Sequence, residues 1–367
     1  MLRIHPVCFC VGVLLITVFG SCTPVELIPP TDGIDLTSWQ TASPKEVGMN
    51  KKILSNAVEK AEDIPRFLSL LVVKNGHLVL EEYFHGNHAD SLNDVRSVTK
   101  SVVSTLTGIA LKEGYIQTLE ETIDAYWPES IAPLSDDQKS IRIRDLLTMS
   151  SGFEWEESGS IGYNDWFQAD DKIKYLLDQP MSDAPGETFA YNSPAVHLLG
   201  VVLEEATNMR LAEFADRYLF SKIGIKEAKW HEFSDGYVNG GSGIDLRPRD
   251  LARLGQFFLQ NGKNKGVQIL PEYWVDEATR PVYDWRTEQG AATSISYGYL
   301  WWTEDMATKA YFAWGYGGQF VFVVPEHQLV VITTIYWGLL SQDGGPEPMY
   351  DAALDIIINE VLRAVED

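Results

Sequence analysis

Strand-like sequence near both ends of the chain, separated by helix-like sequence, most restricts the folds available to these 367 residues. Residues 66–84 hold two apolar runs on either side of Asn75-Gly76. Asn-Gly favours the type I′ turn that matches strand twist, so this segment predicts a β-hairpin. Residues 320–337 hold two further apolar runs around Pro325–Gln328 and predict a second hairpin.

Helical periodicity dominates the region between these hairpins, from about 97 to 285. The segment YGYLWW (297–302) predicts another element of the C-terminal sheet, and residues 349–364 predict an amphipathic closing helix. Strands from both ends must bury their apolar faces together. We therefore predict an α/β fold of the α+β type. One antiparallel sheet, formed by both chain ends and flanked by helices, carries a large inserted, mainly helical region. Residues 42–367 form this domain.

The N-terminus predicts an exported lipoprotein. Arg3 precedes an apolar run of roughly 13 residues (Val7–Phe19), which suits a signal peptide and is too short to span a membrane. Two small residues then precede Cys22, as in bacterial lipoprotein signals. We expect a signal peptide over 1–21, a lipid at Cys22, a Pro-rich tether over 22–41 and a location at the bacterial cell envelope. Plain secretion with cleavage nearby is the alternative.

Charge and cysteine content exclude several functions. The chain carries 52 acidic and 29 basic side chains, a formal net charge of −23, which argues against nucleic acid as a partner. All 3 cysteines (Cys8, Cys10 and Cys22) lie in the first 22 residues. The domain therefore has no disulfide framework, no cysteine-based metal site and no thiol nucleophile. If the domain uses a nucleophilic side chain, we therefore expect it to be a serine.

A buried helix begins at Ser97. No charged residue occurs from 101 to 111, which predicts burial around the whole helix until Gly114 can end it. Lys100 lies one turn after Ser97 on the same face. Burial lowers the pKa of a lysine, so Lys100 can accept a proton from the Ser97 hydroxyl. The helix N-terminus favours a developing oxyanion at Ser97. The alternative is a helix-capping serine followed by a solvated lysine.

The segment 185–193 ends in Tyr191-Asn-Ser193 and leads into a helix that begins near Pro194. A tyrosine hydroxyl beside the Lys100 amine would favour phenolate and supply a second proton shuttle. In the alternative interpretation Tyr191 is a core aromatic, Ser193 caps the helix and Pro194 is its first residue.

Three glycines in the segment 314–319 precede the last hairpin. Glycines at the start of a strand mark a bulge or a close approach of the backbone to a ligand. A backbone N–H in this segment is a candidate second oxyanion donor, beside the N–H of Ser97. A simple bulge is the alternative.

Ser97-x-x-Lys100, then Tyr191-x-Ser193, then a glycine-rich strand resembles the serine β-lactamase and penicillin-binding-protein superfamily. The likeness is greatest to the class C β-lactamase-like esterases and amide hydrolases, and it covers about 40–365. It implies a serine hydrolase that cleaves an ester or amide bond through a Ser97 acyl-enzyme. Lys100 takes the Ser97 proton, and Tyr191, aided by Lys100 and Ser193, protonates the leaving group. No metal or organic cofactor is needed.

Two departures from the class C pattern redirect the expected activity. Ser193 stands where those enzymes carry asparagine, and no lysine or histidine precedes the glycines of the edge strand. The resemblance therefore implies weak or no β-lactamase activity. Tyr191-x-Ser193 followed by this glycine-rich strand is similar instead to the 6-aminohexanoate-oligomer hydrolase branch. That likeness implies Tyr316 as the oxyanion donor, with Gly317 as the alternative register, and Trp302 as a pocket wall or a packed sheet residue.

The expected partners are a small ester, amide or peptide-like substrate and the membrane, reached through the anchor at Cys22. Two other functions stay open. One is a non-hydrolysing penicillin-binding or sensor lipoprotein, which would acylate without turnover. The other is a cell-wall D-Ala-D-Ala peptidase, which the missing edge-strand cation disfavours.

Overall fold

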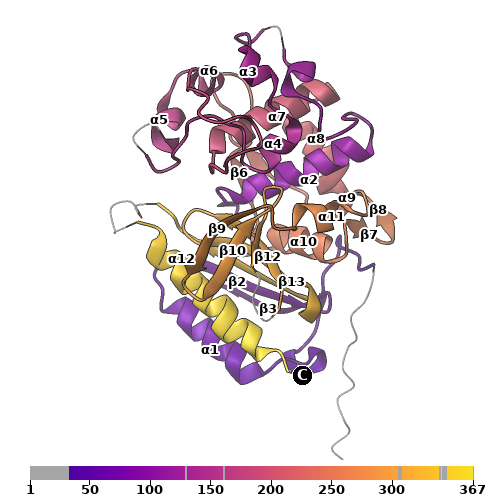
Figure 1. Ribbon diagram of the computed structural model, residues 1–367. Helices are drawn as coiled ribbons and strands as arrows, with labels where there is room; N and C mark the ends of the chain where they lie inside the picture. Colours follow the sequence, from indigo (N-terminus) through magenta and orange to yellow (C-terminus); the bar gives the residue numbers. More distant parts are fainter. Residues whose placement is uncertain are drawn as a thin grey trace, which may run out of the picture.

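The computed structural model describes residues 33–128, 130–159, 162–304, 308–338, 340 and 345–366 (Figure 1). The predicted signal peptide (1–21), Cys22 and the first part of the tether lie outside these ranges. Within them, no helix is both long enough and apolar enough to cross a membrane.

Both ends of the chain contribute to one sheet, with nine strands among the described residues, which confirms the predicted fold. The central N-terminal strand β2 pairs antiparallel with β14, in register Val72↔Val331. Among the described pairings of this sheet only the short edge strand β1 pairs parallel, with β3, and the others are antiparallel as predicted. In spatial order the strands are β1 (Gln40–Thr41), β3 (His77–Tyr83), β2 (Phe67–Lys74), β14 (Leu329–Ile335), β13 (Gln319–Val324), β12 (Ala310–Gly315), β11 (Trp302–Glu304), β10 (Ala292–Tyr297) and β9 (Tyr283–Gln289).

Both predicted hairpins are present. Asn75 and Gly76 join β2 to β3 with φ angles of 51° and 77°, as a type I′ turn requires. A single 3₁₀ turn, Pro325–His327, joins β13 to β14.

The predicted element at 297–302 is not one strand. Tyr297 ends β10, Trp302 begins β11, and the residues between them form a turn. At Gly298 a Cβ would overlap the carbonyl oxygen of Ala278, so the chain turns against α11 (Trp274–Ala278) at that point. The predicted helical region also ends earlier than 285, because β9 begins at Tyr283.

Helices cover the two faces of the sheet in separate groups (Figure 1). On one face, α1 (Lys51–Glu62) lies beside the predicted closing helix. That helix runs through α12 (Glu347–Leu354), a π-helical segment (Asp355–Val361) and a last 3₁₀ turn (Leu362–Ala364). Lys60 of α1 bonds to Asp355 at 2.9 Å across the pair.

The inserted region lies on the other face. Its longer helices are α2 (Val98–Lys112), α7 (Ser193–Thr207) and α10 (Pro248–Leu259). Its shorter helices are η2 (Ile123–Tyr126), α3 (Asp136–Lys139), α4 (Ile143–Leu147), α5 (Tyr163–Gln168), α6 (Lys172–Leu177), α8 (Leu211–Ala215), η3 (Asp216–Phe220), α9 (Ser221–Ile223) and α11. Small strands complete it: β4 (Asn93–Asp94), β6 (Ile244–Leu246) and β5 (Lys229–Trp230) form one sheet, and β7 (Lys263–Asn264) pairs with β8 (Val267–Gln268).

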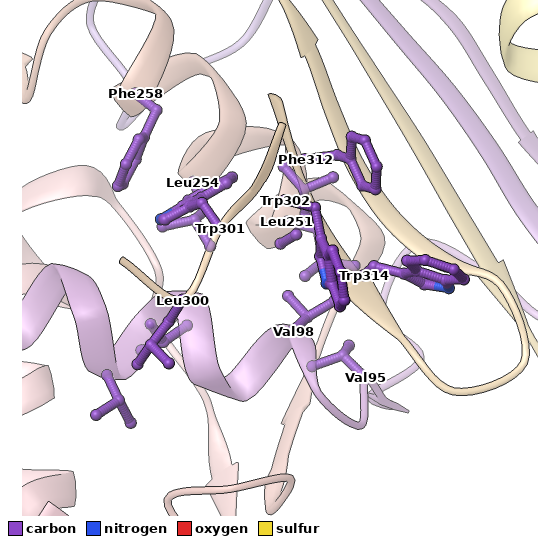
Figure 2. Packing of buried hydrophobic residues seen from close by; sticks show 14 of the residues in the cluster. Val95, Val98, Leu251, Leu254, Phe258, Leu300, Trp301, Trp302, Phe312 and Trp314 are labelled. Carbon is purple, nitrogen blue, oxygen red and sulfur yellow. The ribbon is translucent and has the colours of Figure 1, made fainter. Parts of the chain in front are cut away.

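Helix α2 runs through the centre of the molecule (Figure 1), and both α2 and α10 pack against the sheet. Every residue from Val98 to Ala110 is buried, as the absence of charge predicted. At Gly108 a Cβ would lie 2.6 Å from the Trp274 ring, so only glycine fits there. Figure 2 shows Val98, in the first turn of α2, beside Trp302. This packing fixes the N-terminus of α2, where the candidate nucleophile lies.

Candidate active site

Ser97 lies at a sharp turn between β4 and α2. Arg96 has a φ of 51°, in the left-handed region, and Ser97 then occupies the N-cap position of α2. The Ser97 side chain makes no capping hydrogen bond. Its hydroxyl is therefore available to the groups in front of the helix.

Lys100 is buried beside Ser97. Its Nζ lies 2.9 Å from Ser97 Oγ, 2.8 Å from Ser193 Oγ and 2.6 Å from the Gly241 carbonyl oxygen. The side chain is only 1% exposed. Burial lowers the pKa of Lys100 to about 7, with Arg96 acting in the same direction and Glu157 opposing it. Near neutral pH a large fraction of Lys100 is therefore an uncharged amine, as the sequence predicted.

Ser193 faces Lys100 because it does not cap α7. The cap is Asn192, whose side-chain oxygen accepts from the Ala195 N–H at 2.9 Å. Ser193 and Pro194 are then the first two helical residues, which corrects the alternative with Ser193 as the cap. Asparagine accepts as well at this position as serine does, so the sequence offered two candidate caps one residue apart.

Tyr191 stands over the Lys100 amine. Its ring centroid lies 4.9 Å from Nζ, and the ring stacks on Trp302 at 5.6 Å. Burial raises the pKa of Tyr191, as does the charge of Glu157, while a hydrogen bond with Ser97 acts in the opposite direction. The expected phenolate is therefore wrong, because desolvation outweighs the donors around the ring. Tyr191 is a neutral phenol that can donate a proton.

The glycine-rich turn touches the chain just before Ser97. At Gly315 a Cβ would overlap the Val95 carbonyl oxygen, so the end of β12 rests against the backbone that leads into α2. Gly315 and Tyr316 line the same pocket as Ser97, whereas the described lining does not include Gly317. The glycines thus mark a close approach. The role of the Tyr316 N–H as oxyanion donor stays a prediction.

Replacement of Gly315 by alanine is expected to separate β12 from Val95. We expect a loss of about 1–3 kcal/mol of stability from the overlap and a fall in activity of about 10- to 100-fold from misplacement of the site. Gly114→Ala is the control: nothing lies within 4 Å of its Cβ, but its φ of 79° makes the substitution strained. Denaturation and ester hydrolysis should show both variants destabilised and only Gly315→Ala impaired. Equal activity of the two would contradict this role for Gly315.

The pocket in front of Ser97 has a volume of about 890 Å³. Half of the residues that line it are aromatic: Trp155, Tyr163, Phe189, Tyr191, Trp285, Trp302, Trp314, Tyr316, Trp337 and Tyr350. Trp302 is both pocket wall and packed sheet residue, since it is 5% exposed in β11. Arg96 lies over the Trp337 ring at 4.4 Å and donates to the Tyr163 hydroxyl at 3.1 Å. A second cavity, of about 940 Å³, lies between α11 and strands β10–β12, and its described lining includes none of the predicted site residues.

Sequence analysis missed Glu157 and Gly241. Glu157 accepts hydrogen bonds from the Ser193 hydroxyl and from Trp155. Gly241 approaches α7 so closely that a Cβ would lie 2.7 Å from the Ser193 carbonyl oxygen. The three glycines within residues 240–243 were the available signal for this approach. No sequence pattern marks Glu157, one of many acidic residues in the chain.

The chain is similar to known hydrolases in sequence and in fold. The 6-aminohexanoate-dimer hydrolase of Paenarthrobacter ureafaciens is 23% identical over 283 residues, which is 72% of each chain. Esterase EstB of Burkholderia gladioli is 30% identical over 200 residues, which is 50% of each chain. Among solved structures, a putative 6-aminohexanoate-dimer hydrolase from Bacillus anthracis shares the fold. Its TM-score is 0.72 at 21% identity, over 92% of this chain and 91% of that one.

The family model described as Beta-lactamase matches residues 65–356, well over half of the chain. The match contains Ser97, Lys100, Tyr191 and the glycine-rich turn that rests against Val95. The chain is therefore a hydrolase that is related to esterases and amidohydrolases. Because the family model covers well over half of the chain and the fold is shared, the chain belongs to the beta-lactamase family of serine hydrolases.

Proposed function

We propose that the protein cleaves a small ester or amide through an acyl-enzyme formed on Ser97. The observation that carries the proposal is the buried Lys100 amine, 2.9 Å from Ser97 Oγ, with a pKa lowered to about 7. A neutral amine at this distance is positioned as the general base for the hydroxyl. The names of the hydrolase and esterase relatives support amide and ester bonds as the substrate class.

Acylation begins when Lys100 takes the Ser97 proton and Ser97 Oγ attacks the substrate carbonyl carbon. The N–H groups of Ser97 and Tyr316 stabilise the oxyanion. The neutral Tyr191 phenol then donates its proton to the leaving group as the carbonyl bond to that group breaks, and Lys100 returns a proton to Tyr191. In deacylation, Tyr191 and Lys100 take a proton from a water molecule, which attacks the acyl carbon. The bond to Ser97 Oγ then breaks, and Ser97 regains its proton.

The walls of the pocket favour a substrate with an apolar or aromatic group. Trp285, Trp302 and Trp314 contact one another, with ring centroids 4.6 Å to 5.5 Å apart. Such rings bind planar or aliphatic groups by stacking and burial. Arg96, a cation in the pocket lining, is already held by Tyr163 and by Asp94, 3.6 Å away. We therefore propose little activity on β-lactams, whose carboxylate needs a cation.

We expect the purified protein to hydrolyse a short p-nitrophenyl ester, with kcat/KM rising through pH 7 as Lys100 loses its proton. A fluorophosphonate should label it at one site, and peptide mass spectrometry should map the label to Ser97. Labelling at another residue would refute the proposal. Stable acylation without turnover would favour the sensor alternative, and release of D-alanine from a cell-wall peptide the peptidase alternative.

We also propose export and attachment to the cell envelope through a lipid at Cys22. The support is the apolar segment Val7–Phe19 and the small residues before the cysteine. Cys22→Ala should release the protein from membranes into the soluble fraction. Equal partitioning of the two forms would contradict the anchor.

A further inference from the structure

Glu157 ends a chain of hydrogen bonds that begins at Lys100. Lys100 Nζ lies 2.8 Å from Ser193 Oγ, and the Ser193 hydroxyl donates to one oxygen of Glu157. The other oxygen of Glu157 accepts from the Ser193 N–H at 3.1 Å and from the Trp155 ring N–H at 2.7 Å. Both of these N–H groups can only donate, so they fix which face the carboxylate presents to them.

This arrangement determines which way the Ser193 hydroxyl points. An ionised carboxylate offers only acceptors, and a serine hydroxyl has one proton. With that proton committed to Glu157, Ser193 Oγ can only accept from Lys100. The Gly241 carbonyl oxygen, 2.6 Å from Nζ, also can only accept.

A neutral lysine amine has two N–H groups and one lone pair. Ser193 and Gly241 take the two N–H groups, so the third contact of Nζ, at 2.9 Å to Ser97 Oγ, must use the lone pair. When Lys100 is charged, its three protons serve the same three oxygens. Proton transfer from Ser97 therefore needs no rotation of the lysine side chain.

We propose that Glu157 is a positioning residue that directs the lone pair of Lys100 onto the Ser97 hydroxyl by holding the proton of Ser193. The inference rests on the proposed function, because it assigns Lys100 the role of base. It adds a residue from the loop before α5 to a mechanism otherwise built on α2, α7 and the glycine-rich turn.

Glu157 also acts on Lys100 through its charge, and the two effects can be separated. Glu157 and Arg96 are the charged groups that act on Lys100, and Tyr191 is the other titratable group against it. The negative charge of Glu157 raises the pKa of Lys100. Removal of this charge should shift the acid limb of the pH profile of kcat/KM, where the rate rises as Lys100 loses its proton, to lower pH. Loss of the lone-pair direction should instead lower the plateau that kcat/KM reaches at higher pH.

Glu157→Gln tests both effects with little change of shape. The Ser193 and Trp155 N–H groups require the glutamine oxygen on their side, so the amide nitrogen faces Ser193 Oγ and donates to it. Ser193 is then free to donate to the Lys100 lone pair and divert it from Ser97. We expect the plateau of kcat/KM for a p-nitrophenyl ester to fall about 10- to 100-fold. This is less than the full general-base contribution of about 10²- to 10⁴-fold, because the base is diverted but not removed. The acid limb should shift below that of the wild type.

Glu154→Gln is the matched control, since Glu154 is exposed in the same loop and lies outside the described pocket lining. It should keep both the plateau and the limb. In a Ser193→Ala background, Glu157→Gln should still shift the limb but should lower the plateau no further, because the hydroxyl that transmits the direction is gone.

A Glu157→Gln plateau within twofold of the wild type, or an unshifted limb, would overturn the proposal. An equal further fall of the plateau in the Ser193→Ala background would also overturn it. Failure of the proposed function has a different signature, because wild-type protein would then show no fluorophosphonate label at Ser97.

Discussion

Ser97→Ala is expected to abolish fluorophosphonate labelling and to lower ester hydrolysis by about 10⁴-fold or more. The acyl-enzyme route needs the hydroxyl as nucleophile, and no base can substitute for it. Because Ser97 makes no capping hydrogen bond, its removal should leave α2 and the fold intact. Kinetics, intact-protein mass and a denaturation curve measured on one preparation check the three statements together.

Ser104→Ala is the control for this variant. Ser104 is also in α2, is fully buried, and its hydroxyl has no hydrogen-bond partner among the described residues. Its removal should change neither labelling nor stability by much. Labelling that persists in Ser97→Ala, or that disappears in Ser104→Ala, would place the nucleophile elsewhere.

Lys100→Met is expected to lower kcat/KM by about 10³-fold or more, because methionine is similar in length but cannot take the Ser97 proton. Lys100→Arg should be equally inactive, since a guanidinium stays protonated in proteins. Both variants should lose fluorophosphonate labelling in parallel with hydrolysis. A variant with near wild-type rates would show that another group is the base.

Lys100→Met should also change how the stability of the fold depends on pH. The pKa of Lys100 is about 7 in the folded protein, against an ordinary value of 10.5. Between these values the unfolded chain holds the proton and the folded protein releases it, so rising pH favours the folded protein. Wild type should gain about 1.4 kcal/mol of stability per pH unit relative to Lys100→Met over this window. Denaturant titrations at pH 7.5 and 9.5 measure the difference. A constant difference would mean that Lys100 stays charged in the folded protein.

Local signals predicted a large part of this molecule. The Asn75-Gly76 turn, the uncharged stretch after Lys100 and the pair Ser97–Lys100 each depend on neighbours in sequence. Helix propensity, turn geometry and one-turn spacing act over such short distances, so their pattern is visible without a structure. The strands at both chain ends followed from the same reasoning.

The remaining features depend on contacts between distant segments. Glu157 reaches Ser193 and Gly241 reaches Lys100 only after the insert has folded. Strands β9 and β10 escaped prediction because polar residues at the edge of a sheet resemble a loop. Asn192 and Ser193 could each cap the helix by sequence, and the Ser193–Lys100 contact that distinguishes them joins distant segments.

The pairing of β2 with β14 also sets the order in which the chain can fold. Strand β2 leaves the ribosome early, but its partner is among the last strands to be made. Until then one edge of β2 has no backbone partner, and closing the sheet requires the whole inserted region to be looped out. Folding of the sheet is therefore a late event of long contact order, during which an unpaired strand edge is open to aggregation.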